Sequence, residues 1–133
     1  MNQKFMDGVV YVRHRALLVD DAEWDEFVCT VDAHLSAGGS LKLLVLTDNA
    51  GPNVIQRGQL NDLLTSKGAT LRIAVLSKSM VVRGIVTALS WMGTMRIRAF
   101  SPRDFKGALS FLDAKVSPAD AERIFGEIEI FVG

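Results

Sequence analysis

Acidic residues follow two apolar segments of this chain, and their type and spacing point most clearly to a chemical role. Asp20 and Asp21 come directly after Leu17–Val19, and Asp48 follows Leu44–Thr47. Carboxylates gathered at the ends of neighbouring strands can hold Mg²⁺ and accept a phosphoryl group. A phosphoacceptor site is therefore the first hypothesis to weigh.

The order of the elements argues against this hypothesis. A response-regulator receiver places a helix, a strand and a second helix between its acidic pair and its phosphoacceptor, but only one helix fits between Asp21 and Asp48. Ser101–Pro102 follows the last strand, where a receiver carries lysine. Asp20 is also explained as a helix cap, because Glu23 stands three positions on and completes a capping box. A degenerate receiver-like phosphoacceptor domain is the least favoured interpretation.

The remaining bases and nucleophiles form no catalytic pattern. His14 stands between Arg13 and Arg15 in an apolar segment, which indicates a solvated strand edge, with an anion site as the alternative. His34 falls in the last turn of a predicted helix, where the helix dipole favours it. Cys29 is the only cysteine and lies off the apolar stripe of that helix, so it should be partly accessible. We predict no catalytic residue, no metal site and no cofactor.

Short apolar segments alternate with segments of helical periodicity. The clearest strands are Leu41–Thr47, Leu71–Leu76 and Met95–Phe100. A further strand is expected within Val9–Val19, paired through an Asp7–Gly8 turn with a short strand near Lys4–Met6. This order predicts an α/β fold: a single layered domain over residues 1–133, with a four- or five-stranded, mostly parallel sheet flanked by helices.

Capping residues indicate where the helices begin. A second helix is predicted to open at Gly51–Pro52, with the proline in the first helical position, and a third to span Met80–Trp91. The two closing helices both follow a Ser-Pro-x-Asp sequence, at Ser101–Asp104 and Ser117–Asp120. In each we expect the serine to cap and the proline to take the first position.

Two surface features are candidates for protein contact. One is the outer face of the Met80–Trp91 helix, opposite its core stripe, made of Met80, Gly84, Thr87 and Trp91. A methionine and a tryptophan beside a glycine suit a partner helix that approaches closely, whereas the alternative packs Trp91 under a closing helix. The other feature is the Thr47–Asn53 loop at the carboxyl end of a strand, including Asp48, Asn49 and Asn53.

Composition bounds the function classes. Fifteen basic residues balance fifteen acidic ones. This zero net charge gives no indication of binding to nucleic acid or to an anionic membrane. The most apolar window, Met80–Met92, is interrupted by Arg83 and is too short to span a bilayer. No long apolar stretch follows Met1, so a cytoplasmic location is expected.

The order of elements and several segments resemble the SpoIIAA-like family of the STAS superfamily. The similar segments cover most of the chain: Val9–Val19 with the Trp24 helix, Leu43–Asp48, Ile73–Ser77, Val81–Gly84 and Arg96–Pro102. The resemblance implies a four- or five-stranded mixed sheet flanked by helices, and a non-enzymatic role.

The resemblance also implies a mode of action. Anti-sigma-factor antagonists in the superfamily bind a partner kinase and are switched by phosphorylation of a serine or threonine in the loop after the central strand. The matching loop here, Thr47–Asn53, has no serine and only Thr47 close to the strand end, so Thr47 is the candidate phosphorylation site. Related folds of the SEC14 type hold lipids.

We therefore expect a small cytoplasmic regulatory or scaffold protein that acts by protein–protein contact, as a homodimer. Its contact surfaces would be the Thr47–Asn53 loop and the outer face of the Met80–Trp91 helix. The alternative is a module that holds a small apolar ligand or lipid in a pocket guarded by that loop and the closing helices.

Overall fold

The computed structural model describes residues 1–14, 19–48 and 51–130. Its strands are β1 (Asn2–Met6), β2 (Val9–His14), β3 (Ser40–Thr47), β4 (Thr70–Leu76) and β5 (Met95–Phe100). Its helices are α1 (Asp21–His34), α2 (Val54–Lys67), α3 (Met80–Ser90), α4 (Phe105–Leu112) and α5 (Pro118–Ile130). The predicted α/β class with a mostly parallel, helix-flanked sheet is confirmed.

The described strands lie in the order β1-β2-β3-β4-β5, and among them only the β1–β2 pair is antiparallel. Asp7 and Gly8 both have positive φ, 53° and 80°, as a two-residue type I′ hairpin turn requires. The predicted hairpin is thus confirmed. The strand predicted within Val9–Val19 is β2, which ends at His14, and residues 15–18 lie outside the described part of the chain.

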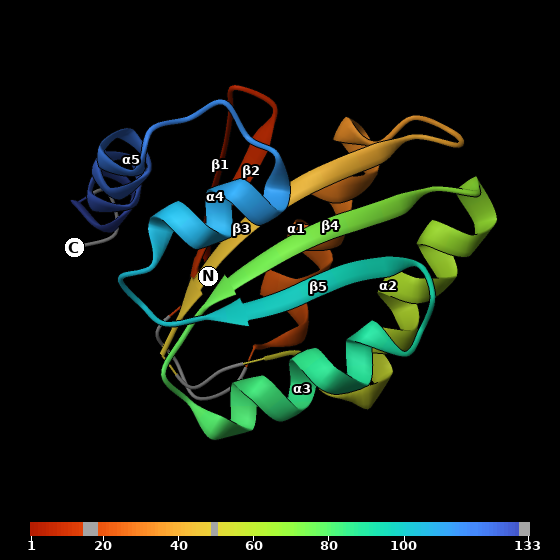
Figure 1. The fold of residues 1–133 in the computed structure, drawn as a ribbon. Helices are drawn as coiled ribbons and strands as arrows, with labels where there is room; N and C mark the ends of the chain where they lie inside the picture. Colours follow the sequence, from red (N-terminus) through yellow and green to blue (C-terminus); the bar gives the residue numbers. More distant parts are fainter. Residues whose placement is uncertain (15–18, 49–50, 131–133) are drawn as a thin grey trace.

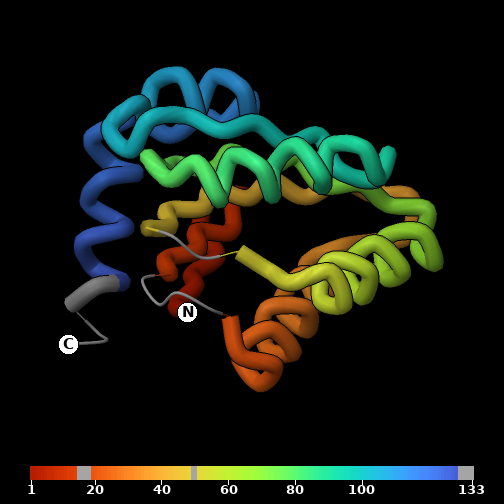
Figure 2. The backbone as a smooth tube through the Cα atoms, turned by 90° about the horizontal axis from the view of Figure 1, so that it is seen from below, coloured from red at the N-terminus to blue at the C-terminus, as the bar shows by residue number. Residues whose placement is uncertain are grey.

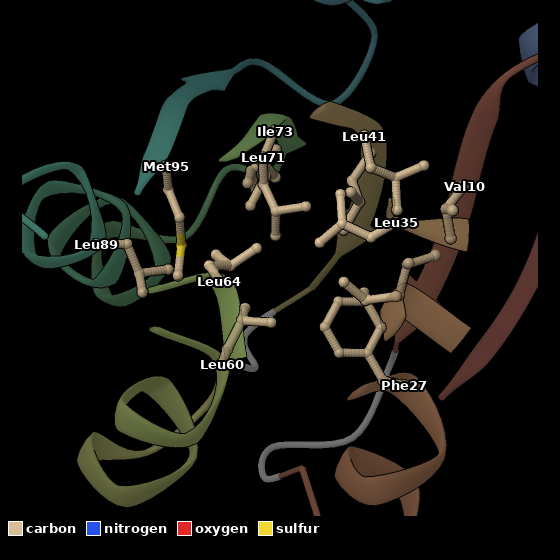
Figure 3. Close-up of a cluster of buried hydrophobic side chains, with 14 of the residues drawn as sticks. Val10, Phe27, Leu35, Leu41, Leu60, Leu64, Leu71, Ile73, Leu89 and Met95 are labelled. Carbon is tan, nitrogen blue, oxygen red and sulfur yellow. The ribbon is translucent and has the colours of Figure 1, made fainter. Parts of the chain in front are cut away.

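The two faces of the sheet carry different helices. Because β2 to β5 are parallel and follow one another in space, their crossover helices α1, α2 and α3 lie on one face, and α4 and α5 cover the other (Figure 1). Figure 3 shows the core on the α1–α3 face, where side chains from three helices meet the strands. Among the labelled residues are Phe27, Leu60, Leu64, Leu71, Ile73 and Leu89.

The N-terminal caps of the closing helices differ from each other. Ser117 caps α5 as predicted, since its Oγ accepts a hydrogen bond from the Asp120 backbone N–H at 3.1 Å. The predicted cap at Ser101 is wrong. Asp104 caps α4 instead, and its Oδ1 accepts from the Gly107 backbone N–H at 2.9 Å. A carboxylate there lies nearer the first free amides, and Gly107 has no Cβ to obstruct it.

Asp20 caps α1 as predicted, accepting a hydrogen bond from the Glu23 backbone N–H at 2.8 Å. The Glu23 carboxylate does not serve the predicted capping box, because it pairs with the amino group of Met1. This ion pair ties the start of the chain to the first turn of α1.

Tyr11 is buried on the α4–α5 face, with its ring edge-on to Phe125 at a centroid distance of 5.6 Å. Its hydroxyl has no hydrogen-bond partner among the residues that the structure describes. Burial raises the pKa of Tyr11 above its usual value, and the carboxylates of Asp7 and Asp120 raise it further.

We expect the free energy of unfolding to fall as pH rises above about 10. The folded protein holds the Tyr11 proton at a pH where the unfolded chain has released it, so this contribution is complete below pH 10 and is lost above it. Tyr11 is the only tyrosine, so tyrosinate absorbance during alkaline titration measures it alone. Tyr11→Phe should make the decline smaller in urea unfolding experiments. An ordinary pKa for Tyr11 in the folded protein would contradict this expectation.

Candidate functional site

The carboxyl ends of the parallel strands bring several predicted site residues to one edge of the sheet. Thr47 lies beside His14 in the register of β2 and β3, and Asp48 follows on the exposed edge. Asn53 is exposed at the start of α2. Asn49 lies outside the described residues. The described residues of the Thr47–Asn53 loop therefore lie at the carboxyl ends of the parallel strands, as predicted.

Arg13 and His14 do not form the predicted solvated edge, and that interpretation is wrong. Both residues are buried because β2 is an inner strand and helices cover both faces of the sheet. The Arg13 guanidinium donates to the carbonyl oxygens of His14 at 3.1 Å and Leu46 at 3.3 Å, and lies 3.6 Å from the Asp48 carboxylate. Arg15 falls outside the described part of the chain. The contacts of Arg13 with His14, Leu46 and Asp48 thus link the carboxyl ends of β2 and β3.

Thr47 and Ser77 are both buried at this edge. The Ser77 hydroxyl donates to the Asp48 carbonyl at 3.3 Å and accepts from the Ser79 backbone N–H at 3.1 Å, so it joins the ends of β3 and β4. The Thr47 side chain is only 4% exposed. A kinase could not reach its hydroxyl in this conformation, and burial gives no support to Thr47 as a phosphorylation site.

The first turn of α2 is fixed by a reciprocal capping box. The Asn53 side chain accepts from the Gln56 backbone N–H at 2.8 Å, and Gln56 Oε1 accepts from the Asn53 backbone N–H at 3.0 Å. The helix therefore begins at Val54. The predicted start with Pro52 in the first helical position is wrong, because the asparagine one residue later satisfies the free amides.

Gln56 also joins α2 to the start of α1. Its side chain is only 1% exposed, and Nε2 donates to the Val19 carbonyl at 2.9 Å and to the Asp21 carboxylate at 3.1 Å. We call Gln56 and its partners Asn53, Val19 and Asp21 the Gln56 clasp. The clasp was not predicted, although the Asn-x-x-Gln spacing at Asn53 and Gln56 is that of a capping box.

The segment that leads into α2 lies against α3. A Cβ on Gly51 would come within 2.6 Å of Ile85 Cδ1, so glycine allows this close approach. Figure 2 shows α3 set apart from α1 and α2, with this segment between them. The Gly51–Pro52 segment thus forms part of the cover over the sheet.

A cavity of about 90 Å³ lies between the sheet and α1–α3, beside the Gly51–Pro52 segment. Apolar side chains from four strands and three helices line it, including Val12, Val45, Val75, Ile97, Trp24, Phe27, Leu60, Val82, Ile85, Val86 and Leu89. His14 and Thr47 contribute its polar part.

The closing helices do not guard this cavity, and that part of the ligand-binding alternative is wrong. None of the described lining residues comes from α4 or α5. The strand order sends these two helices to the opposite face, where they pack on Tyr11, Leu44 and Leu76. The Thr47–Asn53 loop does contribute to the cavity, through Thr47, Gly51 and Pro52.

The outer face of α3 is exposed along its whole length. Trp91 is 83% exposed and Met80 78%, and Gly84 and Thr87 are exposed between them. The alternative that packs Trp91 under a closing helix is therefore wrong. A Cβ on Gly84 would meet no atom within 4 Å. We call these four residues the α3 surface.

Charge is unevenly distributed around the molecule. The segment 77–103, which holds α3 and β5, contains no acidic residue and five exposed basic ones: Lys78, Arg83, Arg96, Arg98 and Arg103. The segment 20–32, which holds most of α1, contains no lysine or arginine and six acidic residues: Asp20, Asp21, Glu23, Asp25, Glu26 and Asp32. The zero net charge of the chain hides this segregation, which a count along the sequence would have found.

The described residues contain no group of three or more His, Cys, Asp or Glu side chains that could hold a metal ion. Among the helices described, none is both long and apolar enough to cross a membrane. No protein-family model, curated protein or solved structure matches the chain. Membership of the SpoIIAA-like family stays a prediction.

Proposed function

We propose that this protein is a non-enzymatic regulatory or scaffold protein that acts through protein–protein contact at the α3 surface. The observation that carries the proposal is the exposure of Trp91 and Met80 on one helix face around Gly84. Tryptophan and methionine are enriched in the cores of protein interfaces, and tryptophan is prominent among the residues that dominate binding energy. A glycine between them lets a partner backbone approach the helix closely.

We propose a second copy of the chain as the first partner, in a homodimer. The helices α1, α2 and α3 form one layer on the sheet. The acidic α1 lies at one end of this layer, and α3, which belongs to the basic segment 77–103, lies at the other. Two copies facing each other through this layer, related by a two-fold axis along the strands, would set α3 of each against α1 of the other. Complementary charge at both contacts would favour this arrangement and speed association.

Gly84→Gln is expected to weaken self-association at least about tenfold, because a long side chain would occupy the space of the approaching partner. Light scattering behind size exclusion, over a range of concentrations, measures the dimer dissociation constant. The change leaves the fold intact, since the new Cβ meets open space and glutamine is the better helix former by up to about 1 kcal/mol.

Gly126→Gln is the matched control, because Gly126 is also a helical glycine with open space at its Cβ but lies in α5, on the other face of the sheet. Equal association of the two variants would place the contact away from Gly84. A wild-type chain that stays monomeric would exclude the second copy as partner and direct the search to another protein with an acidic surface.

A further inference from the structure

The strand β5 forms an open edge of the sheet. Among the described residues it pairs only with β4, and it lies at the end of the sheet opposite β1 (Figure 1). The helix α3 packs against β5 on one face, whereas α4 on the other face packs against β3 and β4. The α4 side of β5 is therefore left largely uncovered.

The outer backbone of β5 has unused hydrogen-bonding groups. The backbone N–H groups of Leu71 and Ser77 donate to the Thr94 carbonyl at 3.0 Å and the Phe100 carbonyl at 3.1 Å. Because backbone groups alternate in direction along a strand, those of Ile97 and Ala99 face away from β4. None of these N–H and C=O groups has a partner among the described residues. An additional strand could use them.

Two arginines project from this edge on the α4–α5 face. Arg98 is in register with Ala74, which is buried on that face, and Arg96 lies two residues earlier. Both are exposed, and neither forms an ion pair within the described part of the chain. The Arg98 Cζ atom lies 5.5 Å from the centroid of the Phe100 ring. Since α3 and α1 lie on the other face, the proposed dimer contact does not use this charge.

An open groove of about 540 Å³ lies between this edge and α4. Its described lining includes Arg98, Ala99 and Phe100 of β5, and Gly107, Ser110 and Phe111 of α4. Arg83 of α3 adds a second guanidinium to the lining. The single carboxylate among these lining residues, that of Asp104, already accepts a hydrogen bond as the cap of α4. The groove therefore offers a bound chain both space beside β5 and an excess of positive charge.

A second copy of the chain does not suit this edge. Two β5 strands side by side would set Arg96 and Arg98 against the same arginines, and like charges directly opposite each other destabilise a pair of strands. The other edge strand, β1, carries Lys4 and no carboxylate. The occupant of the β5 edge has to bring negative charge.

We propose that β5 binds an extended acidic segment of another protein, which adds a strand to the sheet. Every second side chain of the added strand would lie on the α4–α5 face, where carboxylates would pair with Arg96 and Arg98. The side chains between them would lie beside Ile97 and Ala99, which favours small apolar residues there. Backbone hydrogen bonds would give affinity, and the alternating carboxylates would give specificity.

The test uses the peptide Glu-Val-Glu-Val-Glu, flanked by Gly-Ser at each end and with blocked termini. Calorimetry measures its affinity, and hydrogen exchange measures the amides of β5. Saturating peptide should slow exchange at Ile97 and Ala99 at least about tenfold, because their free N–H groups become bonded. The sequence Glu-Glu-Val-Val-Glu has the same charge but no carboxylates two residues apart, and it should bind at least about tenfold more weakly. Equal affinity of the two peptides would overturn the proposal.

Backbone methylation separates strand pairing from attraction of charge. Only every second N–H of an added strand faces β5, so N-methylation of the glutamates and N-methylation of the valines should have opposite effects. One set should abolish binding and the other should preserve it. Blockage by the glutamate set would indicate parallel pairing, and blockage by the valine set antiparallel pairing. The same effect from both sets would overturn the proposal.

Protein variants locate the site. Arg98→Glu should weaken peptide binding about three- to tenfold, whereas the control Lys115→Glu, an exposed position between α4 and α5, should change it by less than about twofold. Trp91→Ala should bind the peptide as the wild type does, so failure of the dimer and failure of this proposal are distinguishable. Equal weakening by Arg98→Glu and Lys115→Glu, or tighter binding of single-stranded oligouridine than of the peptide at the same salt concentration, would overturn the proposal.

Discussion

Gln56→Leu is expected to lower the free energy of unfolding by about 2–4 kcal/mol. Leucine has a similar size but makes none of the polar contacts of the Gln56 clasp. The variant leaves the backbone N–H of Asn53 and the buried carbonyl of Val19 without their partners, and it also loses the bond to Asp21. The bond to Asn53 holds the first turn of α2, and the bonds to Val19 and Asp21 join α2 to the start of α1. The substitution therefore weakens both the helix end and the contact between the two helices.

Urea unfolding monitored by circular dichroism measures this change, with Gln59→Leu as the control. Gln59 lies on the same helix but is exposed, so the same substitution should change stability by no more than about 0.5 kcal/mol. Similar losses in the two variants would mean that the clasp contributes little and that the substitution itself is responsible.

The sequence was sufficient for the fold because its local signals agree with one another. Strand pairing at the N-terminus follows from an Asp7–Gly8 turn, which needs two residues with positive φ and has them. The α5 start follows from Ser117 before a proline. The strand order then determines which face each helix covers, and this explains why the closing helices lie away from the cavity.

The two misplaced helix starts share one cause. In each case a second cap candidate lies within one turn of the predicted one: Asn53 after Gly51, and Asp104 after Ser101. Capping preferences rank these residues closely, so the choice depends on how far the chain must run from the strand end before it can turn onto the sheet. That distance is a tertiary property.

The two candidate sites, the α3 surface and the cavity, also differ in whether local sequence or tertiary structure determines them. The α3 surface followed from helical spacing alone, and all four of its residues are exposed. The cavity depends on the register between strands. Its signal was present in Val12–His14, Val45–Thr47 and Val75–Ser77, which each run valine, any residue, polar residue. Only the pairing of these segments shows that the valines form one row.

Trp91→Ala is expected to weaken self-association on the order of 30-fold or more, because an interface tryptophan at the centre of a contact commonly accounts for 2 kcal/mol or more. The variant should keep its stability within about 0.5 kcal/mol, since the side chain is 83% exposed and the fold does not depend on it. Light scattering behind size exclusion measures the association, and urea unfolding measures the stability.

Phe5→Ala separates a specific contact from general removal of exposed aromatic surface. Phe5 is exposed on β1, at the edge of the sheet farthest from β5, and stacks on His34 of α1. Because Phe5 stacks on α1, against which the proposed dimer sets α3, Phe5→Ala should weaken association far less than Trp91→Ala does if the α3 surface forms the contact. Loss of the dimer in Phe5→Ala alone would move the interface to the β1 edge, where this edge strand would pair its outer backbone with that of a partner. Equal loss in both would identify the self-association as nonspecific contact between aromatic side chains, and the proposal for α3 would fail.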